Sequence, residues 1–419
     1  MNCCKYSLLL KPTLKALKLP STLCRSVTTS FQKVKTTFKP KTAVVLSKVT
    51  RYEFEKQTHQ NFTEKQLQQY LESKRSDYEG LCARHQHHQY CVDLIEKELR
   101  KHGIEVKVVQ RFDLDSDLIN WADVIFTAGG DGTFLLTANK VRSNDKPVIG
   151  LNTDPSRSAG CLCLPKDKYS ASQCDAAIKR LLAGEFRWLQ RQRIRITVSG
   201  HTEKLAPIEL KDQQLLYREH RFLEHVNEHE ANQKPVMSDE NGRTDVLPIV
   251  ALNEVFIGEA LSSRVSYYEM KIDNEPRIKE KSSGVTICTG TGSTSWHFHI
   301  NQLSTDAVDN ILSISNSLSD CKIPLENKAL IKEITKRFNK SLVFDPSELH
   351  MAYTIRDPVR NDVYNVPSVK GFANKIQMRS RMWDAHLVID GGFSFKFNDG
   401  AMATFEIHEE DALKSVIFD

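Results

Sequence analysis

The first half of the chain alternates short apolar runs with longer polar stretches. Thr42–Leu46 is a compact apolar run of the kind that predicts a buried strand. Strands alternating with helices predict a parallel sheet that is covered on both faces. Further strands are predicted at Glu105–Val109, Ala122–Thr127 and Pro147–Leu151, and helices at about 63–73 and 89–101, the second stopping before Gly103. We therefore place an α/β domain at residues 41–190.

The hydrophobic period changes to two at the start of the second half. Ile194, Ile196 and Val198 alternate with polar residues, as expected for a strand with one exposed face. This pattern predicts a mostly antiparallel domain, a β-sandwich, at residues 191–397. Other strand candidates are Val250–Ile257, Val265–Ile272, Gly284–Cys288, Gln377–Arg379, His386–Ile389 and Phe393–Phe397.

Two segments interrupt the second domain. Residues 209–245 are highly charged and have no clear apolar period, which predicts a mobile surface insertion. Residues 303–342 carry apolar residues at helical spacing and predict helices. The apolar positions are Ile311, Leu312, Ile314, Leu318, Leu330, Ile331, Ile334 and Phe338.

The positive charge of the chain is concentrated at its N-terminus. Residues 1–52 contain no Asp or Glu, and omitting residues 1–40 changes the formal net charge from +5 to −3. A basic leader that is rich in Ser and Thr, with Leu14 and Leu17 among its lysines, predicts a mitochondrial transit peptide over residues 1–40 and a location in the matrix. A disordered basic tail is the alternative. Because the basicity belongs to the leader, we expect no nucleic acid as a partner.

The remaining composition argues against several other classes of protein. No apolar stretch approaches the roughly 18 to 20 residues that a membrane-spanning helix needs, so no membrane partner is expected. The ten cysteines include no Cys-x-x-Cys pair and predict neither a zinc site nor a disulfide framework. Cys161 and Cys163 alternate as on one face of a strand. We interpret the cluster of His85, His87 and His88 as part of a solvated helix or loop.

The strongest functional motif is the Gly-Gly-Asp-Gly-Thr turn at Gly129–Thr133. It follows the apolar run Val124–Phe126 and precedes a helical stretch, Phe134–Val141. Glycines between a strand and a helix let the backbone approach phosphate oxygens, and the helix N-terminus adds N–H donors. A carboxylate beside an anion is repelled unless it has a chemical role. We therefore expect Asp131 to take a proton from an attacking hydroxyl or to hold a metal; a simple helix-capping Asp is the alternative.

Two further polar motifs lie in the second domain. Asn253 and Glu254 interrupt the apolar run Ala251–Gly258, and an amide beside a carboxylate suits hydrogen bonds to ribose hydroxyls and a base edge. Thr289–Trp296 combines small and hydroxyl residues that can wrap a nucleotide with an indole, Trp296, that can stack on it. Taken separately, the Asn253–Glu254 pair also fits the end of a surface strand, and Thr289–Trp296 also fits a flexible loop.

The order of these three motifs resembles that of NAD kinases. The Gly-Gly-Asp-Gly-Thr turn alone is shared with lipid kinases and phosphofructokinases, whereas the full set, together with Asp390–Gly391, is similar to NAD kinases from about residue 42 onward. Gly150–Pro155 and Cys288–Gly292 resemble the mitochondrial branch of the family. The resemblance implies a Rossmann-like parallel α/β domain and a C-terminal β-sandwich domain, with the tail at residues 398–419 returning to the first domain.

The resemblance also implies the chemistry. It implies phosphorylation of NAD at the adenosine 2′-hydroxyl, with NAD and ATP as partners, ATP as the phosphoryl donor and Mg²⁺ or another divalent cation as cofactor. Asp131 matches the general base of the family; no metal ligand is assigned. A homo-oligomer, with a dimer favoured, is implied as well. The residues expected to bind substrate or nucleotide are Gly129, Gly130, Gly132, Thr133, Asn152, Asn253, Glu254, Thr291, Gly292, Ser293, Thr294, Ser295, Trp296 (in place of the usual Tyr) and Asp390.

The sequence departs from the family pattern at two places. Ser283 precedes Gly284 where many NAD kinases have Asp, and Ser158–Leu162 stands where many have a Leu-Gly-Phe segment. A carboxylate and an aromatic ring that would hold the two ends of NAD are therefore missing. Neither departure touches Asp131.

Two other functions fit part of the pattern. Lipid kinases share the first motif, but they usually carry a Pro-x-Gly-Thr-x-Asn-Asp segment after it, and Thr153–Ser158 does not match. A non-catalytic NAD-binding protein is favoured by Ser283 and opposed by the intact turn and the Asn-Glu pair. A hydride-transferring dehydrogenase is opposed by the lack of a G-x-G-x-x-G fingerprint.

Overall fold

The computed structural model describes residues 38–201, 205, 207–210, 243–319, 323–360 and 368–418. The predicted transit peptide, apart from its last three residues, and most of the predicted charged insertion at 209–245 lie outside this set. By its internal contacts, the chain from Lys35 onward forms one compact unit.

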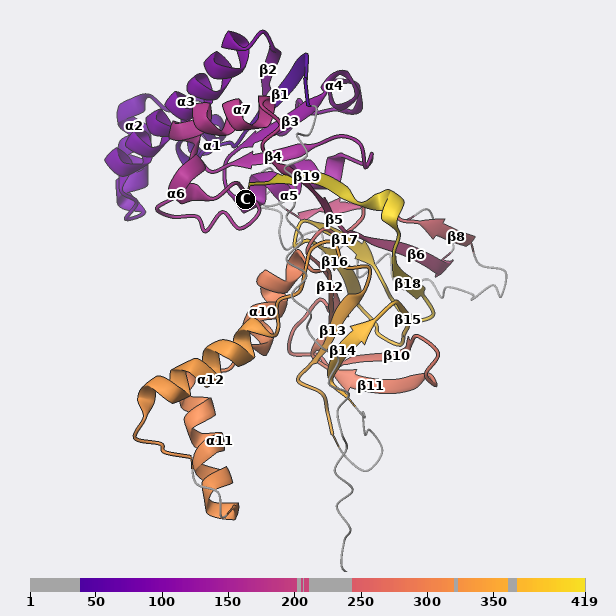
Figure 1. The fold of residues 1–419 in the computed structure, drawn as a ribbon. Helices are drawn as coiled ribbons and strands as arrows, with labels where there is room; N and C mark the ends of the chain where they lie inside the picture. Colours follow the sequence, from indigo (N-terminus) through magenta and orange to yellow (C-terminus); the bar gives the residue numbers. More distant parts are fainter. Residues whose placement is uncertain are drawn as a thin grey trace, which may run out of the picture. The chain divides into compact units, whose positions relative to one another are not determined.

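A parallel sheet forms the centre of the first half (Figure 1). Its strand β1 pairs with β2 on one side and β3 on the other, and β4 pairs with β3. Strand order therefore reverses at β1, and the carboxyl ends of β1 and β3 form the switch point at which such sheets usually bind ligands. The strands, which confirm the four predicted apolar runs, are β1 Thr42–Ser47, β2 Glu105–Val109, β3 Val124–Ala128 and β4 Val148–Leu151.

Helices cover both faces of this sheet. On one face, Ile95 of α3 and Ile178 of α7 are buried in a core shared with β1, β3 and β4. On the other face, Ile119 of α4 and Phe134 of α5 pack against Val44 of β1. Each buried side chain of this size stabilises the fold by roughly 1.5–3 kcal/mol. The helices are α1 Arg51–Thr58, α2 Glu64–Ser73, α3 Tyr78–Lys101, α4 Ser116–Trp121, α5 Asp131–Lys140, α6 Lys166–Tyr169 and α7 Cys174–Leu182.

Two antiparallel sheets form the second half, in the orders β11-β10-β15-β18-β6-β8 and β14-β13-β12-β9-β16-β17-β7. Ile196 and Phe405 of the first sheet and Val255 and Ile287 of the second lie in one apolar core, so the sheets form a sandwich. The strands are β6 Ile194–His201, β7 Ile208–Glu209, β8 Arg243–Val246, β9 Glu254–Glu259, β10 Ser266–Ile272, β11 Ile278–Ser282, β12 Gly284–Cys288, β13 Met351–Arg356, β14 Lys370–Ala373, β15 Lys375–Ser380, β16 Ala385–Ile389, β17 Phe393–Lys396 and β18 Met402–Ile407.

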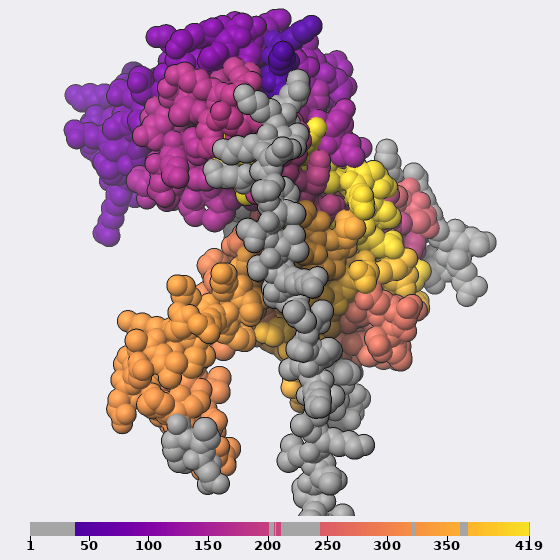
Figure 2. Space-filling view, viewed as in Figure 1, coloured from indigo at the N-terminus to yellow at the C-terminus, as the bar shows by residue number. Residues whose placement is uncertain are grey.

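The last strand lies against the first half of the chain. Strand β19, Leu413–Ile417, pairs antiparallel with β5, Arg187–Arg191. Val416 is buried in the core formed with α3 and α7, and the ring of Phe418 lies 4.7 Å from that of Tyr169. In Figure 2 the yellow C-terminal residues meet the magenta residues of the α/β half.

Arg193 connects the sandwich to the end of α5. The residue is 1% exposed, and its guanidinium donates to the carbonyl oxygens of Ala138 at 3.0 Å and Val141 at 2.6 Å. These carbonyls lie at the C-terminal end of α5, where the helix dipole favours a cation. Burial lowers the pKa of Arg193 to about 10, while Asp411 and Asp390 act in the opposite direction.

Helices α10 Trp296–Asn301, α11 Thr305–Leu318 and α12 Lys328–Lys340 follow strand β12. The last two fall in the segment 303–342 for which helices are predicted. They pack against each other, and Lys328 forms an ion pair with Asp309 at 3.2 Å. None of the helices in the described ranges has the length and apolar character needed to cross a bilayer.

Helix α3 begins at Tyr78, well before the predicted start at about residue 89. Asp77 caps it by accepting a hydrogen bond from the backbone N–H of Gly80 at 2.9 Å. Leu81, His88 and Ile95 are all buried and, by their spacing, share one face of the helix. The apolar period was hidden in the sequence because a histidine occupies one of its core positions.

The prediction of a solvated histidine cluster is wrong for His88. This side chain is 1% exposed, and its ring nitrogens hydrogen-bond with Ser47 Oγ at 2.9 Å and Thr153 Oγ1 at 3.1 Å. Burial lowers the pKa of His88 to about 4. His87 is exposed, and His85 is half-buried. His88 is thus a neutral bridge between the end of β1 and the loop after β4.

His88 should make the fold sensitive to acid. Because its pKa is near 6.5 when unfolded and about 4 when folded, the unfolded chain binds more protons between these values. The stability it contributes is complete above pH 6.5 and is lost as the pH falls toward 4, by up to about 3 kcal/mol. Thermal unfolding of His88→Gln should show a smaller loss over this range than the wild type. His87→Gln should keep the wild-type profile; equal profiles for all three proteins would contradict the expectation.

Candidate active site

The Gly-Gly-Asp-Gly-Thr turn lies at the carboxyl end of β3, where α5 begins. Gly130 is the N-cap of α5, and a Cβ there would lie 2.5 Å from Ser158 Oγ. A Cβ on Gly132 would meet nothing within 4 Å, so the backbone is open on that side. The turn is therefore packed on one side and presents the positive end of a helix on the other. Gly129 is buried, Gly130, Asp131 and Thr133 are half-buried, and Gly132 is exposed.

Backbone amides hold the Asp131 carboxylate. Its oxygens accept hydrogen bonds from the N–H of Cys161 at 3.1 Å and of Leu162 at 2.8 Å. Leu162 is 6% exposed and packs in the same core as Phe134, so the loop that holds the carboxylate is itself anchored. This loop is a turn, so the strand alternation suggested by Cys161 and Cys163 is wrong. In the described part of the chain, the hydrogen-bond donors to the Asp131 carboxylate are two uncharged backbone amides.

Asn152 shapes the same loop. It follows β4, is 1% exposed, accepts a hydrogen bond from the N–H of Asp154 at 2.9 Å and donates to the carbonyl oxygen of Ser158 at 3.3 Å. Ser158 is the residue that packs against Gly130. In this structure Asn152 therefore supports the side of the turn opposite to its open face.

Asp390 positions the Asn-Glu motif. Its carboxylate accepts hydrogen bonds from the backbone N–H groups of Leu252 at 2.9 Å, Asn253 at 2.7 Å and Glu254 at 3.1 Å. Leu252 is fully buried in the core that contains Phe134 of α5. The residue before the second motif thus shares a core with α5, the helix that carries Asp131 in its first turn.

Asn253 and Glu254 are 7% and 8% exposed, yet each has an oxygen, Oδ1 and Oε2 respectively, without a hydrogen-bond partner in the described residues. Burial raises the pKa of Glu254 to about 8, the charge of Asp390 adds to this shift, and a hydrogen bond from Ser295 opposes it. A buried oxygen without a partner costs about 1–3 kcal/mol. The pair is therefore suited to a ligand that brings hydroxyl or amino donors.

The loop of the third motif packs against the second. A Cβ on Gly292 would lie 2.0 Å from the carbonyl oxygen of Asn253, and the N–H of Thr289 donates to the same oxygen at 3.0 Å. A Cβ on Gly290 would lie 2.0 Å from the carbonyl oxygen of Asp345. These backbone contacts require glycine and contradict a flexible loop.

The side chains of this loop face two environments. The buried hydroxyl of Ser293 donates to the carbonyl oxygen of Gly290 at 2.6 Å. Trp296 is 37% exposed, and its ring lies 5.1 Å from that of Phe256 and 5.2 Å from the guanidinium of Arg356. An indole held on one side by these groups keeps exposed surface for another ring. Thr291, Gly292 and Ser293 are buried, Ser295 is half-buried, and Thr294 is exposed.

Arg191 links the first and third motifs and was not predicted. Its Nη1 donates to Thr291 Oγ1 at 3.4 Å, and its guanidinium lies 6.0 Å from the ring of Phe134. Burial lowers the pKa of Arg191 to about 10, while the Asp131 carboxylate acts in the opposite direction. No sequence motif marks Arg191, because its position depends on the pairing of β5 with β19.

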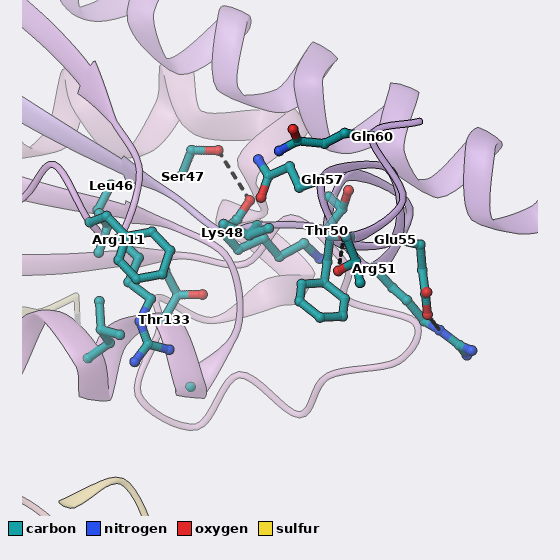
Figure 3. A pocket seen from close by; sticks show the side chains of 16 residues that line it. Leu46, Ser47, Lys48, Thr50, Arg51, Glu55, Gln57, Gln60, Arg111 and Thr133 are labelled. Carbon is teal, nitrogen blue, oxygen red and sulfur yellow. Dashed lines mark hydrogen bonds and ion pairs between the residues drawn. The ribbon is translucent and has the colours of Figure 1, made fainter. Parts of the chain in front are cut away.

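A cavity of about 910 Å³ opens at the switch point of the parallel sheet (Figure 3). Its walls are the end of β1, helix α1, the segment after β2 and the first turn of α5. Of the predicted site residues, Gly132 and Thr133 line it. The other wall residues carry no motif and could not be identified from the sequence. Across the described ranges, no group of three or more His, Cys, Asp or Glu side chains is placed to hold a metal ion.

Comparison with known proteins gives a clear relationship. The chain is 45% identical over 385 residues to NAD kinase 2, mitochondrial, of Homo sapiens, which covers 91% of this chain and 85% of that protein. It is 42% identical over 400 residues to the protein of the same name from Xenopus tropicalis; the alignment covers 91% of this chain and 92% of that protein. The chain belongs to the NAD kinase family. No protein-family model matches it.

A solved structure of an NAD kinase from Archaeoglobus fulgidus in complex with ATP aligns with 90% of this chain and 93% of that one, at 16% identity and a TM-score of 0.48. Membership of the NAD kinase family rests on the sequence relatives and confirms the resemblance drawn from the three motifs. The roles of individual residues stay predictions.

The packing of Gly292 gives a test of the assembled site. Gly292→Ala would place a methyl group against the carbonyl oxygen of Asn253, and backbone atoms cannot move away cheaply. We expect a loss of stability of about 1–3 kcal/mol and weaker NAD binding. Urea unfolding and calorimetry measure these two quantities. The control is Gly132→Ala, whose methyl group would meet no atom within 4 Å; its midpoint of urea unfolding should equal that of the wild type. If Gly292→Ala is as stable as the wild type, the close packing of Gly292 is contradicted.

Proposed function

We propose that the chain transfers the terminal phosphoryl group of ATP to the adenosine 2′-hydroxyl of NAD, with Asp131 as the general base. The observation that carries this proposal is the carboxylate of Asp131 at the start of α5, oriented by two backbone amides beside the open first turn. A carboxylate in this place can accept a proton while the helix N-terminus attracts phosphate.

The step balances as an in-line displacement. The 2′-hydroxyl gives its proton to an oxygen of Asp131 as its own oxygen bonds to the γ-phosphorus. The bond from the γ-phosphorus to the bridging oxygen breaks, ADP leaves, and NADP remains. Since little covalent chemistry falls to the protein, its main contribution is to fix the two reacting oxygens and the phosphorus in line.

NAD is proposed to bind the Asn253–Glu254 pair. The partnerless oxygens of the pair can accept hydrogen bonds from ribose hydroxyls or an amino group, and a protonated Glu254 could also donate one. Arg191 lies between the third-motif loop and Asp131 and would supply positive charge to the bound phosphates. The exposed face of Trp296 is available for a ring of the substrate.

Mg²⁺ is proposed to arrive with the triphosphate. This ion commonly keeps several waters and binds largely through substrate phosphates. Both oxygens of Asp131 already accept backbone amides and this carboxylate is the proposed base, so no protein ligand is assigned to the ion. When bound, the ion would offset charge on the phosphate oxygens.

The mitochondrial matrix is proposed as the location and a homodimer as the assembly. The first rests on the acid-free basic leader and on relatives whose names include "mitochondrial". The second rests on the family resemblance alone. Size-exclusion chromatography with light scattering would test the dimer.

Replacement of the base should strongly reduce turnover and leave the fold intact. Asp131→Asn keeps the shape and can still meet one of the two amides, but it cannot accept the proton. We expect kcat for NADP formation to fall by roughly 10²–10⁴-fold, with the thermal midpoint nearly unchanged. Asp167→Asn, on the exposed surface of α6, serves as the matched control. Wild-type turnover by Asp131→Asn would remove Asp131 from this role, and labelled phosphate on diacylglycerol in place of NAD would favour a lipid kinase.

The leader can be tested separately. Residues 1–40 joined to a fluorescent protein should direct it to mitochondria, because a basic, acid-free amphipathic segment is the signal for import. Replacing Lys15, Lys18 and Arg25 with Glu should leave the fluorescence in the cytosol. Mitochondrial fluorescence from the charge-reversed leader would contradict the transit-peptide assignment.

A further inference from the structure

Three side chains form a stacked layer on the outer face of the sheet that contains β9, β12 and β13. Phe256 of β9 and Arg356 of β13 directly follow Val255 and Ile355, which are buried in the core of the sandwich. Because successive side chains of a strand point to opposite faces, Phe256 and Arg356 share the outer face. The ring of Trp296 lies 5.1 Å from the ring of Phe256, and the Arg356 guanidinium lies 5.2 Å and 5.8 Å from these two rings.

Two glycines make room for this layer. A Cβ on Gly284 would lie 2.6 Å from Cζ of Phe256, and a Cβ on Gly258 would lie 3.1 Å from the same atom. Gly284 is the strand partner of Arg356, and its φ of +122° is a conformation that other residues rarely adopt. A side chain at either position would displace the Phe256 ring. The stacked layer is therefore built into the sheet.

The guanidinium of Arg356 has the two rings as its partners. It forms no ion pair in the described part of the chain. The residue opposite it at the start of β12 is Ser283, whose N–H donates to the carbonyl oxygen of Arg356 at 2.9 Å and whose side chain carries no charge. A guanidinium is planar and is attracted to aromatic faces, best of all to an indole. Arg356 is thus available to hold Trp296.

Strand β13 also holds the helix that carries Trp296. Asn301 of α10 donates to Thr354 Oγ1 at 2.9 Å, and Nδ1 of His297 lies 3.4 Å from the same oxygen. Thr354 precedes Arg356 by two residues on this strand. These two contacts fix the backbone of α10, but they do not involve the indole. The orientation of the Trp296 ring therefore depends on the other two members of the stacked layer.

The stacked layer lies beside the pair to which NAD is proposed to bind. Phe256 follows Glu254 by two residues on β9, so their side chains share a face about 7 Å apart along the strand. Ser295, directly before Trp296, hydrogen-bonds with Glu254. Adenine is attached to the ribose that reacts, whereas two phosphates and a second ribose separate nicotinamide from it. Adenine is therefore the ring that can lie on Trp296 while its own ribose contacts Glu254.

We propose that Arg356 is a positioning residue for the phosphoryl acceptor: its guanidinium holds one face of Trp296, so that the open face receives the adenine ring of NAD. This inference rests on the proposed function and adds a residue that acts through another. Trp296 is 37% exposed, which leaves surface for a ligand. A ring that is already fixed loses less entropy when adenine binds. Since the contacts of Arg356 are with rings and not with Asp131, it affects binding and not the chemical step.

The first test removes the guanidinium. Arg356→Leu should raise KM for NAD, and the Kd of both NAD and ADP-ribose in calorimetry without ATP, by roughly two- to thirtyfold, because a cation–ring contact is lost. Its kcat should stay within about twofold of the wild type. ADP-ribose lacks nicotinamide, so an equal loss for both ligands assigns the effect to the adenosine half. Arg356→Gln should show the same loss and replaces Arg356→Leu if that variant unfolds.

The matched control is Arg264→Leu, at an exposed position of the loop after β9. It removes a guanidinium from the same domain without touching the stacked layer, so KM, kcat and both dissociation constants should equal those of the wild type.

The second test asks whether Arg356 acts through the indole. Trp296→Leu should weaken the binding of NAD, and adding Arg356→Leu to it should raise Kd by less than about twofold more, because coupled residues have non-additive effects. Fluorine NMR of protein labelled with fluorotryptophan needs no substrate. The Trp296 resonance, assigned by its absence from Trp296→Leu, should shift in Arg356→Leu and keep its place in Arg264→Leu.

The outcomes separate this inference from the proposed function. If Arg356→Leu keeps the wild-type Kd for NAD and ADP-ribose, or weakens binding equally with and without the indole, the inference fails. A loss for NAD alone would place nicotinamide on Trp296 and also overturn it, as would a wild-type protein that does not bind ADP-ribose. If the wild type forms no NADP, the proposed function fails, while calorimetry with ADP-ribose and the fluorine resonance still decide the role of Arg356.

Discussion

The buried guanidinium of Arg193 is the constraint on which the geometry of the site depends. It begins the sandwich, at the residue before β6, yet donates to the carbonyl oxygens of Ala138 and Val141 at the end of α5. The other end of this helix carries Asp131. One side chain therefore fixes the base relative to the domain that holds Asn253 and Glu254. Without Arg193, these buried carbonyl oxygens would lose their hydrogen-bond donors. Each unpaired carbonyl would destabilise the present arrangement of the two halves by about 1–3 kcal/mol.

The two halves divide the chemistry between them. The parallel sheet places a helix N-terminus and a basic cavity at its switch point, which suits phosphate. The sandwich instead buries an amide and a carboxyl, held by Asp390 and by the glycines of the third motif, which suits hydroxyl and amino donors. Arg191 stands where these two regions meet.

The sequence predicted the features that are local. The four parallel strands were recognisable because buried strands read as continuous apolar runs, and the turn at Asp131 because strand, glycines and helix are consecutive. Features that depend on distant contacts were not. The start of α3 was hidden by His88, whose place in the core depends on Ser47 and Thr153, far away in the chain. The position of Arg191 depends on the pairing of β5 with β19, and the cavity depends on the reversal of strand order at β1. Neither pairing can be read from the local sequence.

The hydrogen bonds of Asp131 explain how a carboxylate can stand beside phosphate. Two backbone amides orient it, and neither carries a full charge. A paired Lys or Arg would hold it more strongly but would also stabilise the ionised form, which makes it a weaker proton acceptor. Amides from a loop anchored by Leu162 fix its direction without placing a full charge on it. The positive charge needed for the triphosphate can then come from Arg191, which belongs to β5 and whose charge interacts with that of Asp131 without being its hydrogen-bond donor among the described residues. Because the cation belongs to another element, the turn itself can attract an anion with its backbone and accept a proton with its carboxylate in the same step.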